Sequence, residues 1–384
     1  MRALVRVGLV TTSYPRFAGD PAGCFVAEHA RYLESRGHDV EVIAAGDPPD
    51  DRAVRVPGEA LFYRGGGPEA LEHGGAGAWA AAARFTARLT VEIARRAGRW
   101  DAVVSHWLVP SALAAMAAAP RRPLLAIAHS GDVHTLRRSG ALGPFAALCA
   151  ARPRLRLSFV SRELRDLFLA AAPRLLRPRL DCASQVCPMG IELARLRAAP
   201  RAAPSVPTVL FLGRLVPVKG AVIAAAAARR WRSGARLVVA GAGPEEASLR
   251  ALAAAAPPGL IELCGEVHGE ARDRLLAAAD LVVVPSVRTA AGRSEGTPMA
   301  ALEAMATGAA VVASRIGGLA DIPVVTHVPP ADPAALAAAI DHLLASPGAR
   351  ADQIAAQARF IADYDWSRIG PRLDPEWFRM NPNR

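Results

Sequence analysis

Short apolar runs alternate with stretches of helical periodicity along the whole chain. In the first half this pattern predicts five strands, at residues 5–11, 38–45, 102–107, 123–130 and 157–161. A helix is predicted over residues 23–37, because Gly37 is typical of the glycine that follows a helix. Ala-rich helical stretches also separate the later strands. Strands separated by helices indicate a parallel sheet that is covered on both faces.

The same pattern restarts after a Pro- and Ala-rich stretch at residues 197–207, which is typical of a linker. Five more strands are predicted, at residues 208–214, 236–243, 261–265, 280–286 and 309–314. The fold class is therefore α/β, with two Rossmann-like, doubly wound domains that face each other across a cleft. Open parallel sheets bind ligands at the carboxyl ends of their strands, so we expect the ligand site there.

The length and composition of the chain predict how many domains it has and in which cellular compartment it works. At 384 residues the chain is too long for one compact core and fits two domains. The five cysteines form no C-x-x-C pair, which favours reduced, buried thiols in a cytoplasmic protein, with a disulfide between Cys182 and Cys187 as the alternative. The first apolar stretch is too short for a signal peptide, and no apolar run reaches the ~20 residues of a membrane span.

The positive charge is concentrated in one part of the chain. Of a net charge of +11, residues 121–201 account for +10, with 15 arginines against five acidic residues. This stretch predicts an anionic partner, such as a membrane surface or a lipid phosphate; a solvated arginine-rich face is the alternative. Nucleic acid is the least favoured partner, because only three aromatic residues, Phe145, Phe159 and Phe168, could stack on bases there.

The stretch "SEGTPMAALEAMATG" at residues 294–308 contains the strongest local signal. Thr297 is predicted as the N-cap of a helix and Pro298 as its first residue, so free backbone N–H groups there would bind an anion. Glu295 and Glu303 would lie at opposite edges of one pocket and suit a sugar or ribose beside a phosphate. Alternatively, Glu295 complements the helix dipole and Glu303 is a surface residue.

The only lysine of the chain, Lys219, follows Arg214 in a turn between a strand and a helix. The other 45 basic residues are arginines, so a lysine at this position suggests a need for a compact ammonium group. Two cations on such a turn suit a diphosphate. The alternative is that both are solvated loop residues.

Three residues of the first half are further candidates. Gly23, at a helix start, would let a phosphate approach the backbone, or it simply forms a turn. His129 stands at the end of a buried strand, where it is either a ligand-binding or a structural histidine; His106 has a similar position and a weaker case. The sequence contains no H-E-x-x-H, G-x-S-x-G or P-loop motif, and no metal site is predicted.

Taken together and in order, five stretches resemble the retaining glycosyltransferases of the GT-B fold, specifically glycosyltransferase family 4. They are "SRGHDVEVI", "FVSRELRDLF", "VCPMGIEL", "GRLVPVKG" and "EGTPMAALEAMATGAAVVAS". The resemblance covers nearly the whole chain. It implies an acceptor-binding domain at residues 1–200, on which residues 361–384 pack back, and a donor-binding domain at residues 201–360.

The resemblance also implies roles for the candidate residues. Arg214 and Lys219 would hold the donor diphosphate, and Glu303 the ribose hydroxyls. Glu295 would bind hydroxyls of the donor sugar and take part in catalysis. Beside it lie the backbone groups of Gly296, Thr297, Pro298 and Met299. In the first domain, Gly23 would contact the diphosphate and His129 the donor sugar.

The implied reaction moves a hexosyl or N-acetylhexosaminyl group from a nucleoside diphosphate sugar to a hydroxyl, without metal or cofactor. The acceptor would be a sugar, a lipid-linked compound or a small molecule in glycolipid, polysaccharide or glycoconjugate biosynthesis. Two alternatives stay open: a GT-B sugar-nucleotide epimerase, and an inactive scaffold that only binds nucleotide sugars. The chain departs from the family after Gly317 and Gly318, where a D-G-x-x-G turn is lacking.

Overall fold

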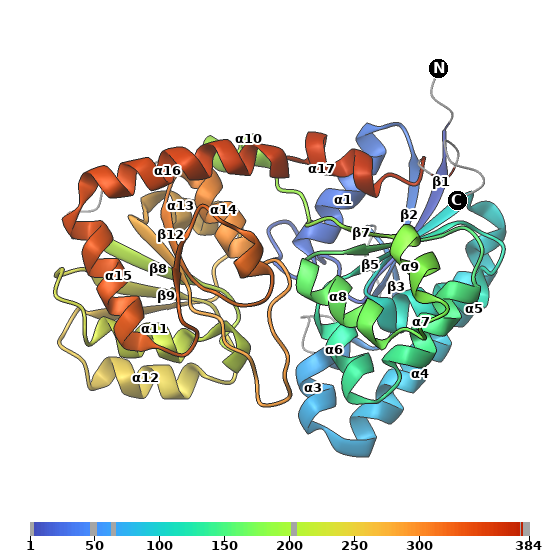
Figure 1. Ribbon diagram of the computed structural model, residues 1–384, viewed down its shortest axis with the longest axis horizontal. Helices are drawn as coiled ribbons and strands as arrows, with labels where there is room; N and C mark the ends of the chain where they lie inside the picture. Colours follow the sequence, from blue (N-terminus) through green and yellow to red (C-terminus); the bar gives the residue numbers. More distant parts are fainter. Residues whose placement is uncertain (1–3, 47–51, 63–66, 201–205, 377, 379–384) are drawn as a thin grey trace. The chain divides into compact units, whose positions relative to one another are not determined.

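The protein consists of two compact units, each built on a parallel sheet (Figure 1). The computed structural model describes residues 4–46, 52–62, 67–200, 206–376 and 378. Unit 1 comprises Met1–Gly190 and Trp366–Arg384, and unit 2 comprises Ile191–Asp365. The chain leaves unit 1 before the predicted boundary at residue 200, because Ile191, Leu193 and Leu196 are buried in the core of unit 2. Of the predicted linker, residues 201–205 lie outside the described residues.

The sheet of unit 1 has the order β3-β2-β1-β4-β5-β6-β7 and is parallel throughout. Its strands are β1 (Arg6–Val10), β2 (Asp39–Ala45), β3 (Val54–Val56), β4 (Ala102–His106), β5 (Leu124–Ala128), β6 (Leu155–Phe159) and β7 (Ser184–Val186). The five predicted strands are confirmed. The two edge strands, β3 and β7, were not predicted, because three residues are too few to show an alternating pattern.

Helices connect these strands as the pattern predicts. They are α1 (Cys24–Ser35), α2 (Glu59–Phe62), α3 (Gly67–His73), α4 (Gly75–Arg96), α5 (Leu113–Ala118), α6 (Gly131–Arg138), α7 (Leu142–Ala151), α8 (Arg162–Ala171), α9 (Arg177–Ala183) and α17 (Trp366–Leu373), with single turns η1 (Ala97–Arg99) and η2 (Leu108–Ala112). Gly37 follows α1 with φ 87°, and the N–H groups of Gly37 and His38 donate to carbonyls of the last turn. The last helix, α17, packs on α1, where Gly370 leaves room for the ring of Tyr32.

The sheet of unit 2 has the order β10-β9-β8-β11-β12-β13 and is also parallel. Its strands are β8 (Thr208–Leu212), β9 (Arg236–Ala240), β10 (Ile261–Gly265), β11 (Leu281–Val284), β12 (Ala310–Ser314) and β13 (Thr326–Val328). All five predicted strands are present, and the short β13 is an additional one. Adjacent residues of β8 enter different apolar clusters, Leu210 in one and Phe211 in the other, so both faces of this sheet are buried.

The helices of unit 2 cover both faces of its sheet. They are α10 (Leu193–Arg197), α11 (Ala221–Ala228), α12 (Glu246–Ala254), α13 (Gly269–Ala278), α14 (Met299–Thr307), α15 (Pro333–Ala345) and α16 (Pro347–Ile361), with single turns η3 (Pro217–Lys219), η4 (Gly317–Asp321) and η5 (Ala362–Tyr364). Each unit is thus a doubly wound α/β domain, which confirms the prediction of two such domains.

All five cysteines are free, including Cys182 and Cys187. The prediction that they are buried is wrong for three of them, because Cys182 and Cys264 are exposed and Cys24 is half-buried. Within the described ranges, no helix is both long and apolar enough to cross a membrane.

Candidate active-site residues

Loops at the carboxyl ends of β8 and β11 are joined in unit 2. The N–H of Val287 donates to the carbonyl of Val218, at 3.0 Å. Gly220 has φ 72°, and a β-carbon there would lie 1.9 Å from the carbonyl oxygen of Pro285. Only glycine fits this close approach. The turn that ends in Lys219 is therefore fixed against the loop after β11, which leads toward Glu295.

Lys219 and Glu295 form an ion pair in this region. The Nζ of Lys219 lies 2.8 Å from Oε2 of Glu295, and their side chains are 24% and 12% exposed. The sequence pattern separates these residues by 76 positions, and the fold brings them together. Because each group is partly desolvated, the pair places a cation and a carboxylate side by side in a protected position.

The segment after β12 holds the backbone of Glu295. The N–H of Gly318 donates to the carbonyl oxygen of Glu295, at 3.2 Å. Gly317 has φ 55°, and a β-carbon there would lie 2.3 Å from the same oxygen. The two glycines therefore anchor Glu295 in this chain, although the D-G-x-x-G turn is lacking.

Arg214 stands in the loop after β8, with its side chain half-buried. The loop is tied to the end of β9, because Gly213 donates to the carbonyl of Ala240 and Leu215 donates to that of Ala242. Gly241 makes a close approach in the same place, since a β-carbon there would lie 1.8 Å from the carbonyl oxygen of Gly213. The structure thus puts Arg214 on a rigid loop of the same unit as Lys219.

Helix α14 begins later than predicted. Its first residue is Met299, and its N-cap is Pro298, which has φ −69° and ψ 110° and makes no side-chain cap. The prediction that Thr297 is the N-cap and Pro298 the first helical residue is therefore wrong, because Pro298 adopts extended backbone. Gly308 follows the last helical residue with φ 82°. Gly296 and Pro298 are buried at its start, whereas Thr297 and Met299 are half-buried.

Glu303 lies inside unit 2 rather than on its surface. Its side chain is 4% exposed and forms an ion pair with Arg272 of α13. The alternative that Glu303 is a surface residue is therefore wrong. A carboxylate buried to this degree needs a positive partner, and Arg272 supplies it. Sequence reasoning missed Arg272, which stands 31 positions before Glu303 with no motif to connect them.

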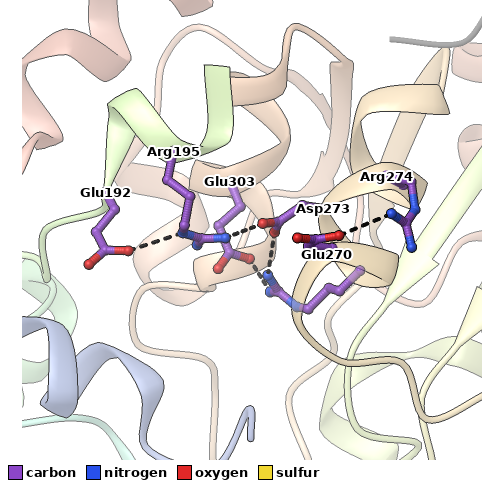
Figure 2. A network of polar contacts seen from close by, with 7 residues as sticks. Glu192, Arg195, Glu270, Asp273, Arg274 and Glu303 are labelled. Atoms are coloured by element: carbon purple, nitrogen blue, oxygen red, sulfur yellow. Dashed lines mark hydrogen bonds and ion pairs between the residues drawn. The ribbon is translucent and has the colours of Figure 1, made fainter. Parts of the chain in front are cut away.

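The pair extends into a network of ionised side chains (Figure 2). Asp273, the neighbour of Arg272 on α13, forms an ion pair with Arg195 of α10. The Nε of Arg195 also lies 3.0 Å from a carboxylate oxygen of Glu192. The network therefore connects α10, the first helix of unit 2, to the helix that carries Glu303.

In unit 1, Asp132 holds the backbone next to His129. Oδ1 of Asp132 accepts from the N–H groups of His129 and Ser130, at 3.2 and 3.1 Å, and Oδ2 accepts from Leu108, at 2.7 Å. Burial raises the pKa of Asp132 to about 6, and the backbone donors oppose this shift. The carboxyl group thus ties the loop after β4 to the loop after β5.

His129 is the outer member of a chain of three histidines. Nε2 of His129 lies 3.0 Å from Nδ1 of His106, the last residue of β4, and Nε2 of His106 lies 3.0 Å from Nδ1 of His29 on α1. Burial lowers the pKa of His29 to about 4, that of His129 to about 3, and that of His106 well below 6.5. All three rings are therefore neutral at pH 7. Sequence reasoning missed His29, because nothing in its helical context distinguishes it from a core residue.

Aromatic rings surround His129. The ring of Phe25 lies 5.0 Å from it and that of Trp107 lies 4.9 Å from it, while His106 stacks on it at 5.1 Å. Trp107 has φ 72°, which is rare for a non-glycine residue and indicates a constrained loop. The half-buried imidazole is thus held in one place by packing as well as by hydrogen bonds.

Gly23 forms the N-cap of α1 with φ 70°. A β-carbon there would lie 2.3 Å from the carbonyl oxygen of Ser13, so the backbone alone requires glycine. Its contact with a diphosphate stays a prediction. In the described parts of the chain, no group of three or more His, Cys, Asp or Glu side chains is placed to hold a metal ion.

Sequence comparisons match two families to consecutive parts of the chain. Residues 22–201 match the family described as Glycosyltransferase Family 4, and residues 206–346 match that described as Glycosyl transferases group 1. The D-inositol 3-phosphate glycosyltransferase of Acidothermus cellulolyticus is 32% identical over 91% of this chain and 83% of its own length. The enzyme of the same name from Mycobacterium tuberculosis is also 32% identical, over 92% of this chain and 78% of its own.

Solved structures share the fold at lower identity. Sucrose-phosphate synthase from Thermosynechococcus elongatus has a TM-score of 0.73 and 20% identity, covering 99% of this chain and 100% of that one. Anabaena HepE in complex with UDP-glucose has a TM-score of 0.68 and 18% identity, covering 96% and 98%. With two parallel-sheet domains and these relatives, the chain belongs to the family 4 glycosyltransferases of the GT-B fold.

Proposed function

We propose that this glycosyltransferase moves a hexosyl or N-acetylhexosaminyl group from a nucleoside diphosphate sugar to an acceptor hydroxyl, with retention of the anomeric configuration. The observation that carries the proposal is the ion pair between Lys219 and Glu295 at the carboxyl ends of the unit 2 strands. An ammonium group suits the donor diphosphate, and a carboxylate suits sugar hydroxyls. Glu303, on the following helix, would accept from the ribose hydroxyls.

During transfer, negative charge develops on the leaving diphosphate. Arg214 and Lys219 would stabilise that charge, and loss of one such contact costs on the order of 3 kcal/mol of barrier, or roughly a hundredfold in rate. In unit 1, Gly23 would contact the diphosphate and His129 the donor sugar. The proposal includes no metal ion or cofactor, so the rate should be the same with and without EDTA.

The donor is the first question for experiment. The related fold of HepE is known in complex with UDP-glucose, so UDP-sugars are the first donors to test. A thermal-shift screen with UDP-, GDP-, ADP- and dTDP-sugars should show a rise in melting temperature with one base. If a nucleotide sugar is converted without any acceptor, the protein is an epimerase, and if it binds but never turns over, it is a scaffold.

Retention follows from attack on the face that the diphosphate leaves. Glu295 as a covalent nucleophile is the less favoured route, because its carboxylate is already paired with Lys219. NMR of the first product, recorded before anomers equilibrate, tests the stereochemistry. An inverted linkage would contradict the proposal.

The acceptor is proposed from the curated relatives. Two of them, at 32% identity, are named D-inositol 3-phosphate glycosyltransferases, so a phosphorylated polyol is the first acceptor to test. Lipid-linked and saccharide acceptors of glycolipid or polysaccharide synthesis form the second group. Product formation with inositol 3-phosphate, compared with free inositol, shows whether the acceptor phosphate is recognised.

We place the reaction in the cytoplasm, with peripheral binding to an anionic membrane through the arginine-rich stretch. Leu175 is 94% exposed, and the exposed Arg174 and Arg179 stand one residue before it and four residues after it, so an apolar side chain and positive charge occur in one short segment. Arg152 does not contribute, because it is buried and donates to the carbonyls of Ala119 and Arg122. Co-sedimentation with vesicles should increase with anionic lipid and decrease with salt and with Leu175→Ser.

A further inference from the structure

The three-histidine chain of unit 1 ends on a backbone carbonyl. Nε2 of His29 lies 3.2 Å from the carbonyl oxygen of Leu373, in the last turn of α17. The ring of His29 also stacks on that of Trp366 in the same helix, at 5.3 Å and 13°. Residues from the C-terminal segment therefore fix both the position and the hydrogen bonding of His29.

A carbonyl oxygen can only accept a hydrogen bond. This sets the direction of each hydrogen bond among the three histidines. Nε2 of His29 must carry the proton, so Nδ1 of a neutral His29 is an acceptor. His106 then donates from Nε2 to His29 and accepts at Nδ1. By the same step, His129 donates from Nε2 to His106, which leaves Nδ1 of His129 without a proton.

The three imidazole rings must be neutral for the hydrogen bonds to run in this direction. A doubly protonated His106 would donate from both nitrogens, and His129 would then have to accept at Nε2 and carry its proton on Nδ1. Burial lowers the pKa of His106, and the neighbouring His129 and His29 lower it further, so His106 does not take up this second proton. Within the described part of unit 1, no hydrogen bond involves Nδ1 of His129, so this acceptor is available to a ligand.

We infer that His29 and His106 are positioning residues that hold His129 in its Nε2–H tautomer, so that Nδ1 accepts a hydrogen bond from a hydroxyl of the donor sugar. The assignment of that hydroxyl rests on the proposed function. A neutral acceptor favours a hydroxyl over an anionic group at this point, since an anion offers no proton to donate. The Leu373 carbonyl of α17 thereby fixes the tautomer of His129 through the side chains of His29 and His106.

The tautomers can be measured directly. Long-range 1H–15N correlation spectra of the full chain, labelled with 15N-histidine, distinguish Nε2–H from Nδ1–H rings, and point variants assign the signals. At pH 7.5 we expect all three histidines to be neutral with the proton on Nε2. A protonated Nδ1 on His129 would overturn the inference, whatever the activity of the protein.

Two variants of His29 separate the direction of the hydrogen bonds from their presence. His29→Asn keeps a hydrogen-bonding group near the position of Nδ1 but loses the Nε2–H that donates to Leu373, whereas His29→Leu removes both. We expect both variants to release the tautomers of His106 and His129, because the Asn amide can present either its oxygen or its NH2 group to His106. His73→Leu is the control, because His73 is an exposed histidine of the same unit. Near-UV circular dichroism of each variant shows whether the fold is kept.

Binding gives the functional readout. With UDP-glucose and UDP as probes, His29→Leu should lower the preference for UDP-glucose by about fivefold, as expected for loss of one hydrogen bond, and leave UDP affinity unchanged. His29→Asn should lower this preference as well, and His73→Leu should keep it. Unchanged preference in a folded His29→Leu contradicts the inference. If the wild type itself does not prefer UDP-glucose, the donor-sugar assignment fails, and the tautomer spectra still decide whether His29 and His106 position His129.

Discussion

The ammonium group of Lys219 lies 2.8 Å from Oε2 of Glu295, so the only lysine of the protein is paired with a glutamate of the strongest sequence motif. Each partner has a proposed ligand of its own, the diphosphate for Lys219 and the sugar hydroxyls for Glu295. In the absence of ligand the two groups neutralise each other. Donor binding would therefore have to redistribute an existing ion pair, which makes the two residues energetically coupled.

Replacing Lys219 tests whether this position requires an ammonium group. Lys219→Ala should lower kcat/KM by about a hundredfold, because one cation facing the leaving diphosphate is removed. Lys219→Arg should also be impaired, since the larger guanidinium has to occupy a half-buried position beside Glu295. Steady-state kinetics and melting temperatures should be compared with Arg250→Ala, an exposed cation of the same unit. Normal activity of Lys219→Arg would show that the lone lysine has no special role.

Glu295→Gln should have opposite effects on binding and catalysis. Because Lys219 loses its competing carboxylate, affinity for free UDP should rise by about threefold, the size of a partly exposed ion pair. The rate of transfer should fall by about a hundredfold, because the charged acceptor for the sugar hydroxyls is removed. Calorimetry with UDP and initial-rate kinetics give the two values. A fall in UDP affinity would mean that Glu295 supports the bound diphosphate rather than competing for Lys219.

Two arginines on α13 provide a matched test of the buried carboxylate (Figure 2). Arg272→Ala leaves Glu303 buried without its partner and should cost about 3–5 kcal/mol of unfolding free energy. Arg274→Ala breaks a pair whose side chains are 59% and 91% exposed, so its effect should stay within about 0.5 kcal/mol. Urea denaturation followed by circular dichroism measures both. Equal effects would contradict the special role of the Glu303 pair.

The sequence predicts the central strands well because both faces of a covered parallel sheet are apolar. The run Leu281–Val284 is buried along its whole length and has no polar interruption. The edge strand β13 has only three residues, two of them half-buried, so no alternation marks it. Helix starts are less predictable, since Thr297 has the right chemistry for an N-cap but Pro298 takes that position through its backbone angles.

The candidate site was only partly predictable for a different reason. Lys219, Glu295 and His129 stand in local motifs, and a pattern of a few residues is enough to select them. Their partners are set by long-range packing. His29 lies 77 positions from His106, and its partner Leu373 contributes only a backbone carbonyl, whose acceptor character does not depend on the side chain. No short-range pattern can encode such contacts.

Acid should destabilise the protein because His29 stays neutral in the folded state. Burial lowers its pKa from 6.5 to about 4, against smaller opposing effects of the Leu373 carbonyl and Asp374. Between these pH values the unfolded chain binds a proton that the folded chain does not, so stability rises with pH. The contribution is complete above pH 6.5 and is lost as the pH falls toward 4, which amounts to about 3 kcal/mol. Asp132, with its raised pKa, acts in the opposite sense.

The variant His29→Asn isolates this contribution, because the amide does not titrate. Urea denaturation of wild type and variant at several values between pH 7.5 and pH 4.5 gives the difference in unfolding free energy. The advantage of the wild type should shrink as the pH falls. His342→Asn, at an exposed position on α15, is the control and should track the wild type. A constant difference for His29→Asn would show that His29 titrates alike in both states.

Gly220 should be far less tolerant of a side chain than Gly234, although both have nearly the same backbone angle, φ 72° and φ 70°. Alanine at either position would have to adopt left-handed backbone, which destabilises the folded state by about 1 kcal/mol. At Gly220 the new β-carbon would also lie 1.9 Å from the carbonyl oxygen of Pro285, whereas nothing lies within 4 Å at Gly234. The loop must then move, and Lys219, its neighbour, moves away from Glu295. Gly220→Ala should therefore lower both the melting temperature and kcat/KM, while Gly234→Ala lowers only the former, slightly. Equal activity of the two variants would show that the rigid contact between the loops does not position Lys219.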